Sequence, residues 1–585
     1  MKRATVFILA IMLIMALALA GCKDNAQPSA VEPSIATSNS AAASSTPLAT
    51  AKSADEPTFG GTVTYAYDQP FQGILEPALF SENADNLILN FISEPMFTTG
   101  DDLKTYPDLA TWTESADHLT FTFKIKEGVK WHNGDELTAE DWKFALEIIS
   151  SPDTTSPRYD SVKMIVGADA YHDKTATSIS GIQITDPHTM VITVNAAAPN
   201  VLSSLWGYPM PKKYYAGIAI DKFADSDQVR KNPIGLGPFK VKKIQSGEYV
   251  EMVRNDDYWK GKPYLDGVIF KTIDGSLATS LLENGEADIM TLPTSQYSDA
   301  QKLDNLDLIK QESLSYKYIG FKLGKWDADK SLNIMNLPKF ADKKLRQAMS
   351  YAIDRQKLID AFYTGLGTPL AVPMPLVSWA KIPDDQINTY SYNPNKAKEL
   401  LDEAGYKDTD GDGKREDPAG KKLVMSFDAI GGSETDDPNA QAILQFWGDI
   451  GLDVKLNGGA LKELNAYYEA VEADDPSVEL FSATWGLGSD PDPTGLWKSD
   501  DQWNYSRWVN ADSDRLIAEG TSVKAFDETY RKQVYYDWQK LVNDEVPMIF
   551  LYSPIDVTAK NKRLQGVHVN SFTNQVDVNQ WWVSK

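Results

Sequence analysis

The sequence predicts an α/β protein that folds into at least two lobes. Helical and strand-like patterns interleave along most of the chain, as they do in α/β folds. The chain has 585 residues, whereas a single hydrophobic core stops growing at roughly 250 to 300 residues. It contains one cysteine, so we expect the burial of apolar side chains, without disulfides, to hold the lobes together.

The N-terminus has the layout of an export signal. Lys2 and Arg3 precede an uncharged apolar run over 4–20, which is typical of a secretory signal peptide ending at residue 21. The next residue is Cys22, and Leu19-Ala20-Gly21-Cys22 is similar to the lipobox of bacterial lipoproteins. This likeness implies that Cys22 is acylated on its sulfur and anchors the exported chain to the membrane. The alternative is an ordinary signal peptide followed by an incidental cysteine.

The segment 22–58 has the composition of a flexible tether. It is rich in Ala, Ser, Thr and Pro and contains no Phe, Trp or Tyr, so it cannot bury enough apolar surface to offset the entropy of ordering. As a flexible coil its root-mean-square span is roughly 30 to 35 Å. The formal net charge of −25 argues against nucleic acid as a partner, because binding to phosphate backbones needs clustered Lys and Arg.

The folded part opens near residue 60 with elements that have clear periodicity. Leu119, Phe121, Phe123 and Ile125 alternate with polar residues, which predicts a strand with one solvated face. The capping-box pattern from Thr138 to Asp141 predicts a helix that starts at Thr138. Further strands are expected around 190–194 and 239–241, the second after a tight Gly- and Pro-rich turn at 233–238.

The second half alternates helices and strands. Apolar residues at spacings of three and four predict one amphipathic helix over 345–362, which stops near Gly365. The same periodicity predicts helices at 395–404, 440–450 and 529–542. Strands are expected at 424–427, 452–456, 480–483 and 548–552.

Few motifs of catalysis are present. The five histidines have none of the spacings of a zinc helix, and neither a nucleophile elbow nor a phosphate-binding glycine loop occurs. We therefore predict that the protein is not an enzyme. An extracellular glycosidase is a rival hypothesis, because its carboxylate pair has no local signature, although the sequence singles out no such pair.

One acidic loop resembles the start of a calcium site. Asp408, Asp410 and Asp412 occupy positions one, three and five of an EF-hand pattern, and a glycine stands at position six. Position twelve is Ala419 rather than a bidentate Glu. An acidic turn is therefore the favoured interpretation, with Ca²⁺ bound at 408–417 as the alternative.

A Gly- and Pro-rich turn follows the predicted strand at 480–483. The segment 485–493 reads Trp-Gly-Leu-Gly-Ser-Asp-Pro-Asp-Pro, which places Asp490 and Asp492 where a ligand can approach the backbone closely. Taken alone, this pattern favours a rigid surface turn with solvated carboxylates.

Several blocks in order resemble the oligopeptide-binding family, the large solute-binding proteins of peptide ABC importers. The most specific block runs from Phe121 through Trp131-His132-Asn133-Gly134 to Trp142. Other matches lie at 179–186, 233–239, 254–263, 340–348 and 351–355. The chain departs from the family between Phe321 and Phe340, where the family usually has a shorter connection.

The resemblance implies a two-lobe fold like that of periplasmic binding proteins, with an additional domain in the N-terminal half. The implied division is lobe I at 59–100, 233–318 and 554–585, the extra domain at 101–232, and lobe II at 319–553. His132 would then be a satisfied turn residue rather than a metal ligand. Asp490 is similar in context to the acid that pairs with a peptide's α-ammonium, with Asp492 as the alternate.

The resemblance also implies a function and its partners. We expect a lipid-anchored extracellular receptor, a monomer without cofactor, that captures oligopeptides and delivers them to the permease subunits of an ABC transporter. Trp485, Gly486 and Ser489 would line the binding cleft together with Trp503, Asn504 and Tyr505. The alternatives are the same fold carrying an oligosaccharide, a nickel chelate or haem, and a peptide pheromone sensor.

Overall fold

The computed structural model describes residues 56–572 and 575–584. The predicted signal peptide, Cys22 and most of the predicted tether lie outside these residues. Within the described part of the chain, no helix is long and apolar enough to cross a membrane.

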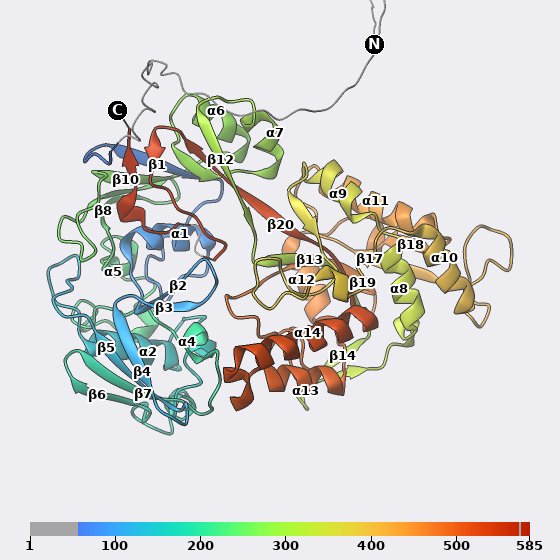
Figure 1. Ribbon diagram of the computed structural model, residues 1–585, viewed down its shortest axis with the longest axis horizontal. Coiled ribbons are helices and arrows are strands. Elements are labelled where there is room, and N and C mark those ends of the chain that lie inside the picture. Colours follow the sequence, from blue (N-terminus) through green and yellow to red (C-terminus); the bar gives the residue numbers. More distant parts are fainter. Residues whose placement is uncertain (1–55, 573–574, 585) are drawn as a thin grey trace, which may run out of the picture. The chain divides into compact units, whose positions relative to one another are not determined.

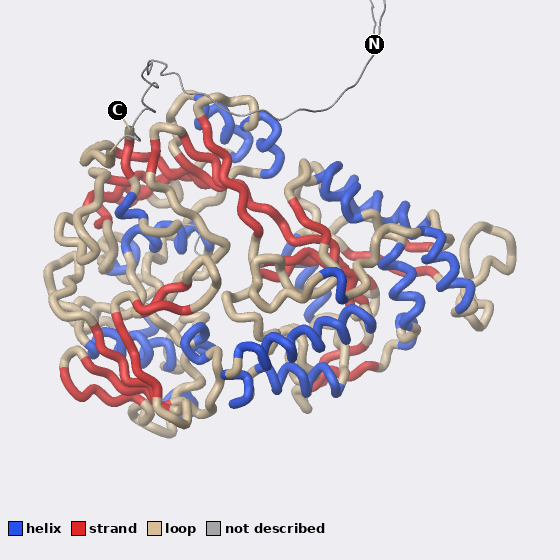
Figure 2. The backbone as a smooth tube through the Cα atoms, in the orientation of Figure 1, coloured by secondary structure: helices blue, strands red, loops and turns tan. Residues whose placement is uncertain are grey.

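A twelve-stranded sheet runs through the folded body (Figures 1 and 2). Its order is β18-β17-β19-β13-β20-β11-β1-β10-β9-β8, and β12 and β16 also pair with β20. The bounds in this order are Asp453–Leu456, Val424–Asp428, Leu480–Gly486, Ser315–Phe321, Met548–Asn561, Ile289–Thr291, Thr62–Tyr67, Gly267–Thr272, Tyr249–Arg254 and Phe239–Gln245, with β12 at Leu306–Glu312 and β16 at Gly367–Pro369. Helices and strands alternate around this sheet, so the predicted α/β class is confirmed.

Strand β20 joins two groups of strands, as Figure 1 shows. Its first half pairs with β13 and β16, and its second half, from Ile555 to Asn561, pairs with β12 and, at its end, with β11. We call β1, β8–β12 and their helices lobe I, and β13, β16–β19 and their helices lobe II. The change of partner falls between Pro554, which pairs with β16, and Ile555, which pairs with β12.

Lobe I packs helix α1 (Asn83–Ile92) against the sheet. Apolar side chains of β1, β8 and β10 form a buried core with Phe91 and Trp581. A second, smaller core holds α6 (Ala278–Glu283) and α7 (Tyr297–Ala300) against β20. Two small antiparallel pairs of strands, β2–β3 (Phe97–Thr99 and Thr105–Pro107) and β21–β22 (Leu564–Gln565 and Trp582–Val583), complete this region.

A separate four-stranded sheet, β4-β5-β7-β6, forms the additional domain. Its strands are Ala110–Glu114, Thr120–Ile125, Thr189–Thr193 and Ile182–Asp186, and its helices are α2 (Ala139–Ser150), α3 (Ala168–His172), α4 (Val201–Ser204) and α5 (Asp227–Arg230). The predicted strand is β5, with Phe121, Phe123 and Ile125 buried. The predicted cap is also present, because Asp141 accepts a hydrogen bond from the Thr138 amide at 2.9 Å.

His132 ties this domain to the Gly-rich turn that leads into β8. The Gly235 amide donates to its Nδ1 at 3.0 Å, so Nε2 carries the proton and donates to the Gly237 carbonyl at 3.0 Å. Burial lowers the pKa of His132 to about 4, which keeps the ring neutral. A Cβ on Gly235 would lie 1.8 Å from the Ile92 carbonyl oxygen, so this close approach requires glycine. The two hydrogen bonds engage both ring nitrogens of His132 with the backbone, as expected of a satisfied turn residue.

Lobe II buries the largest apolar cluster of the described residues. Its helices are α8 (Lys343–Tyr351), α9 (Arg355–Phe362), α10 (Pro394–Glu403), α11 (Asp436–Gly448), α12 (Leu464–Glu472), α13 (Ala511–Gly520) and α14 (Glu528–Glu545). The long connection after β13 folds into a hairpin, β14–β15 (Gly324–Asp327 and Leu332–Met335).

The expectation of one helix over 345–362 is wrong. The segment forms two helices, α8 and α9, and the chain turns between them. The Asp354 side chain accepts a hydrogen bond from the Lys357 amide at 3.1 Å and thereby caps a new helix. The apolar periodicity continues across the break because both helices bury their apolar faces in the same core.

Candidate functional site

The Gly- and Pro-rich turn leaves the end of β19 and borders a cavity of about 140 Å³. Gly486, Asp490 and Asp492 line this cavity together with Pro373, Met374 and Trp497. The turn therefore combines close backbone approach with carboxylates at the carboxyl end of a strand, a common position for ligand sites in open α/β sheets.

Both oxygens of Asp490 are engaged by one guanidinium. Arg531, on α14, donates from Nη1 and Nη2 to the two carboxylate oxygens at 2.9 and 2.6 Å. Its Nε donates to the Gly520 carbonyl at 2.9 Å, which fixes the fork in place. Only 7% of the Arg531 side chain and 16% of the Asp490 side chain are exposed. Such a bidentate pair is strong and directional.

Asp492 makes a different set of contacts. It accepts from the Thr494 amide at 3.1 Å and from the Thr494 hydroxyl at 2.8 Å. Its second oxygen accepts from the side-chain Nδ2 of Asn200, which lies next to α4 of the additional domain, at 3.1 Å. Burial raises the pKa of Asp492 above its ordinary value. Among the described residues, Asp492 forms no ion pair, whereas Asp490 pairs with Arg531.

The remaining predicted cleft residues do not gather around this cavity. Trp485 stacks on Tyr505 with ring centroids 5.4 Å apart, and the Tyr505 hydroxyl donates to Glu472 at 2.7 Å. Ser489 is buried, and Trp503 is 51% exposed. Asn504 is fully buried and donates to the Trp508 carbonyl at 2.8 Å. In this structure the Asn504 amide holds the turn that follows the cavity.

Comparisons with known proteins agree with this architecture. Residues 104–506 match the model of the bacterial extracellular solute-binding proteins, family 5, middle region. The chain belongs to this family.

Relatives of this solute-binding family align over most of the chain. The oligopeptide-binding protein AppA of Bacillus subtilis is 28% identical over 598 aligned positions, covering 100% of this chain and 99% of AppA. The oligopeptide-binding protein OppA of Lactococcus lactis is 27% identical and covers 77% of this chain and 76% of OppA.

Solved structures of the family share the fold. The structure of Bacillus subtilis AppA in complex with a nonapeptide aligns with a TM-score of 0.69 at 27% identity, covering 91% of this chain and 100% of AppA. The substrate-binding protein CtaP of Listeria monocytogenes aligns with a TM-score of 0.76 at 25% identity, covering 90% and 100% of the two chains. The predicted two-lobe binding-protein fold and the predicted resemblance are thereby confirmed.

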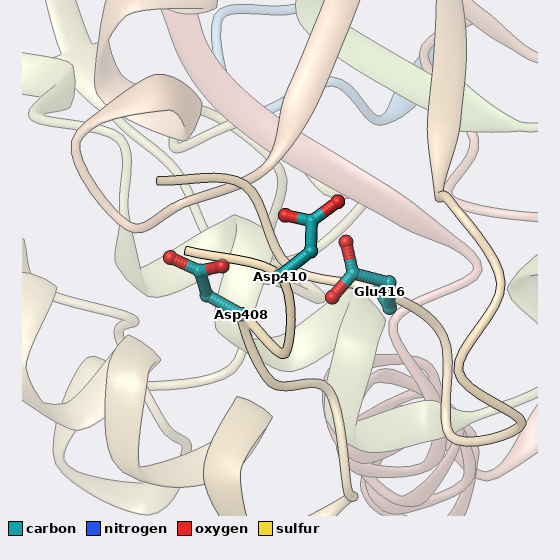
Figure 3. A group of neighbouring side chains, drawn as sticks. All are labelled: Asp408, Asp410 and Glu416. Atoms are coloured by element: carbon teal, nitrogen blue, oxygen red, sulfur yellow. The ribbon is translucent and has the colours of Figure 1, made fainter. Parts of the chain in front are cut away.

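The acidic loop of this solute-binding protein brings three carboxylates together (Figure 3). Oxygens of Asp408, Asp410 and Glu416 lie within 4.8 Å of one another. The Thr409 amide and hydroxyl donate to Glu416 at 2.8 and 2.7 Å. Asp412 is not one of the three and pairs with Lys422 at 2.8 Å, and Lys422 also contacts Asp410 at 3.2 Å. Local hydrogen bonds and the Lys422 ammonium thus already engage several of the carboxylate oxygens in this loop.

Calcium binding at 408–417 stays a prediction that competes with the acidic turn. We expect a calorimetric titration to give no heat at millimolar Ca²⁺, because Lys422 already balances part of the negative charge. Heat that disappears in Asp408→Asn would favour the calcium site instead.

At the cavity beside Asp490 and Asp492, sequence reasoning missed two partners, Arg531 and Asn200. Arg531 lies within the predicted helix 529–542, but no local pattern links it to a turn 41 residues earlier. Asn200 belongs to another domain altogether. Local composition identified the turn, whereas its partners depend on the tertiary fold.

Proposed function

We propose that this protein is a lipid-anchored receptor on the outer face of the cell membrane that captures oligopeptides and delivers them to the permease subunits of an ABC transporter. The observation that carries the proposal is the full-length similarity to oligopeptide-binding AppA, whose solved structure holds a nonapeptide. The two-lobe fold supports it, because such a fold can close on a ligand through contacts made by both lobes. We further propose that the receptor acts as a monomer.

Tolerant recognition of peptides needs contacts to the main chain. A peptide repeats its backbone amides whatever its sequence, so strand-like hydrogen bonds supply affinity and pockets supply preference. The glycines of the turn at 486–488 leave the backbone open to such an approach, because a Cβ on Gly486 or Gly488 would meet no atom within 4 Å.

Native mass spectrometry of the purified protein tests the cargo. We expect a heterogeneous set of bound masses that tandem fragmentation resolves into oligopeptides. An oligosaccharide, a nickel chelate or haem as the bound species would overturn the peptide proposal while leaving the fold assignment intact. Loss of signalling without loss of peptide uptake in a deletion strain would favour a pheromone sensor.

The anchor has its own test. Cys22→Ala is expected to move the protein from the membrane fraction to the medium, because the thiol that carries the acyl chain is removed. Retention in the membrane fraction at the wild-type level would contradict the lipid anchor. Cys22→Ser serves as the matched variant, since it replaces only the sulfur atom by oxygen and should release the protein in the same way.

The turn carboxylates predict how a peptide's amino terminus is held. If Asp490 pairs with the α-ammonium, Asp490→Asn weakens free-amine peptides by about 2 to 5 kcal/mol and spares N-acetylated ones. Arg531 already engages both oxygens of Asp490, which makes Asp492 the alternate partner for the ammonium. Asp492→Asn is therefore measured beside Asp490→Asn as the matched variant. Isothermal titration with each peptide pair measures the difference, and equal losses for both forms would refute an ammonium role.

A further inference from the structure

A second cavity lies in lobe II, at the carboxyl end of β17 and beside the middle of β19. Its volume is about 230 Å³, and it shares none of its lining residues with the cavity beside Asp490. Phe427, Ile430 and Ile443 contribute apolar walls. Lys317, Asp436 and Asn439 contribute polar groups. Polar and apolar side chains thus share the lining, and convergent polar groups of this kind fix the orientation of a side chain or small ligand in a pocket.

Lys317 brings a positive charge to this cavity without a carboxylate partner. Its Nζ donates to the Tyr363 hydroxyl at 3.0 Å and lies 5.3 Å from the centre of that ring. The ion pairs of the described residues do not include Lys317. An ammonium has three donors, so Lys317 retains donors for a guest in the cavity.

Asp436 and Asn439 bring acceptors from the first two turns of α11. Asp436 Oδ2 accepts from the Ser433 amide at 2.7 Å. Asn439 is 7% exposed, and its Nδ2 donates to the same Tyr363 hydroxyl at 3.1 Å. Its Oδ1 receives no hydrogen bond from the described residues. Lys317 and Asn439 therefore meet at one hydroxyl, and an unsatisfied acceptor remains beside the donor.

We propose that this cavity selects a carboxamide side chain, glutamine or asparagine, of the bound ligand. The inference rests on the proposed function, because it assigns a side-chain preference to a peptide receptor. A carboxylate would pair with Lys317 but face Asp436, and an ammonium would pair with Asp436 but face Lys317. A carboxamide accepts from Lys317, donates to the acceptors on α11 and carries no charge for either residue to repel.

Nonapeptides of alanine and serine with one guest residue provide the probe. The guest is Gln, Glu, Lys or Met, moved in turn through each internal position, and binding is measured by isothermal titration. We expect one position at which Gln binds at least about 10-fold more tightly than the other three guests, since a site built for hydrogen bonds discriminates against groups that cannot complete them.

Two charge variants test the assignment in opposite directions. In Asp436→Asn the cavity keeps only Lys317, so Glu becomes the preferred guest at that position. In Lys317→Met it keeps only Asp436, so Lys becomes the preferred guest. Each switch is expected to be about 10-fold or more, because a like-charge contact is removed and an ion pair remains. Asp437→Asn, an exposed neighbour that does not line the cavity, is the control and should keep the Gln preference.

The outcomes separate this inference from the proposed function. Peptides that bind without a position-specific Gln preference overturn the assignment of the cavity alone. A Gln preference that survives unchanged in both charge variants overturns it as well. If none of the nonapeptides binds, the proposed function fails and the inference with it. Circular dichroism melts of the variants check that altered preference does not arise from misfolding.

Discussion

Arg531→Met is expected to lower the free energy of unfolding by about 3 to 5 kcal/mol, because it removes one partner of a largely buried ion pair. The guanidinium supplies both bonds to Asp490 and a third to the Gly520 carbonyl. Without it, the Asp490 carboxylate stays in the cavity wall with no cation opposite. Methionine keeps the length of the stem, so packing changes little. Urea denaturation followed by tryptophan fluorescence measures the loss.

Arg515→Met is the matched control on the neighbouring helix. Arg515 pairs with Asp512 and Glu519, but 54% of its side chain is exposed. Exposed pairs contribute about 0 to 1 kcal/mol, since water and salt screen them. If both variants lost the same small amount of unfolding free energy, this would contradict the view that the Arg531–Asp490 pair stabilises the turn.

Strand β20 illustrates why part of the fold escaped sequence reasoning. The apolar run at 548–552 predicts a short strand, and Pro554 normally ends one because it lacks an amide donor. The strand instead continues to Asn561. Near Pro554 it exchanges β13 for β12 as its partner. That exchange depends on a strand more than 200 residues away, so local pattern carries no sign of it.

Several elements with a clear local period or cap were predicted correctly, because the residue spacing that identifies them lies within the element itself. The strand around Phe123 and the helix that begins after Thr138 both follow from spacing and capping, and both form as expected. The candidate site divides in the same way. Glycines and prolines mark the turn that carries Asp490, whereas the roles of Arg531 and Lys317 arise only when helices and strands pack together.

The second large effect is expected at Asp474, a buried carboxylate that meets two cations. It accepts from Arg507 Nε at 2.8 Å, from Lys322 Nζ at 2.5 Å and from the Trp326 amide at 2.7 Å. The side chains of Lys322 and Arg507 are 2% and 1% exposed. Asp474→Asn would leave both charges buried without an anion, so we expect a loss of about 3 to 5 kcal/mol at pH 7. Asp512→Asn, which breaks only an exposed pair, is the control and should cost about 0 to 1 kcal/mol.

The pH dependence of this loss identifies its cause. Burial lowers the pKa of Lys322 from the ordinary 10.5 to about 8, so the unfolded state binds more protons between these values and wild-type stability rises with pH across that window. Removal of Asp474 lowers the Lys322 pKa further, because the charge that favours the ammonium is gone. By pH 10 Lys322 is neutral in both folded proteins, and only the contribution of Arg507 remains. The deficit of Asp474→Asn should therefore shrink from pH 7 to pH 10, whereas a constant deficit would mean that Lys322 is not responsible for it.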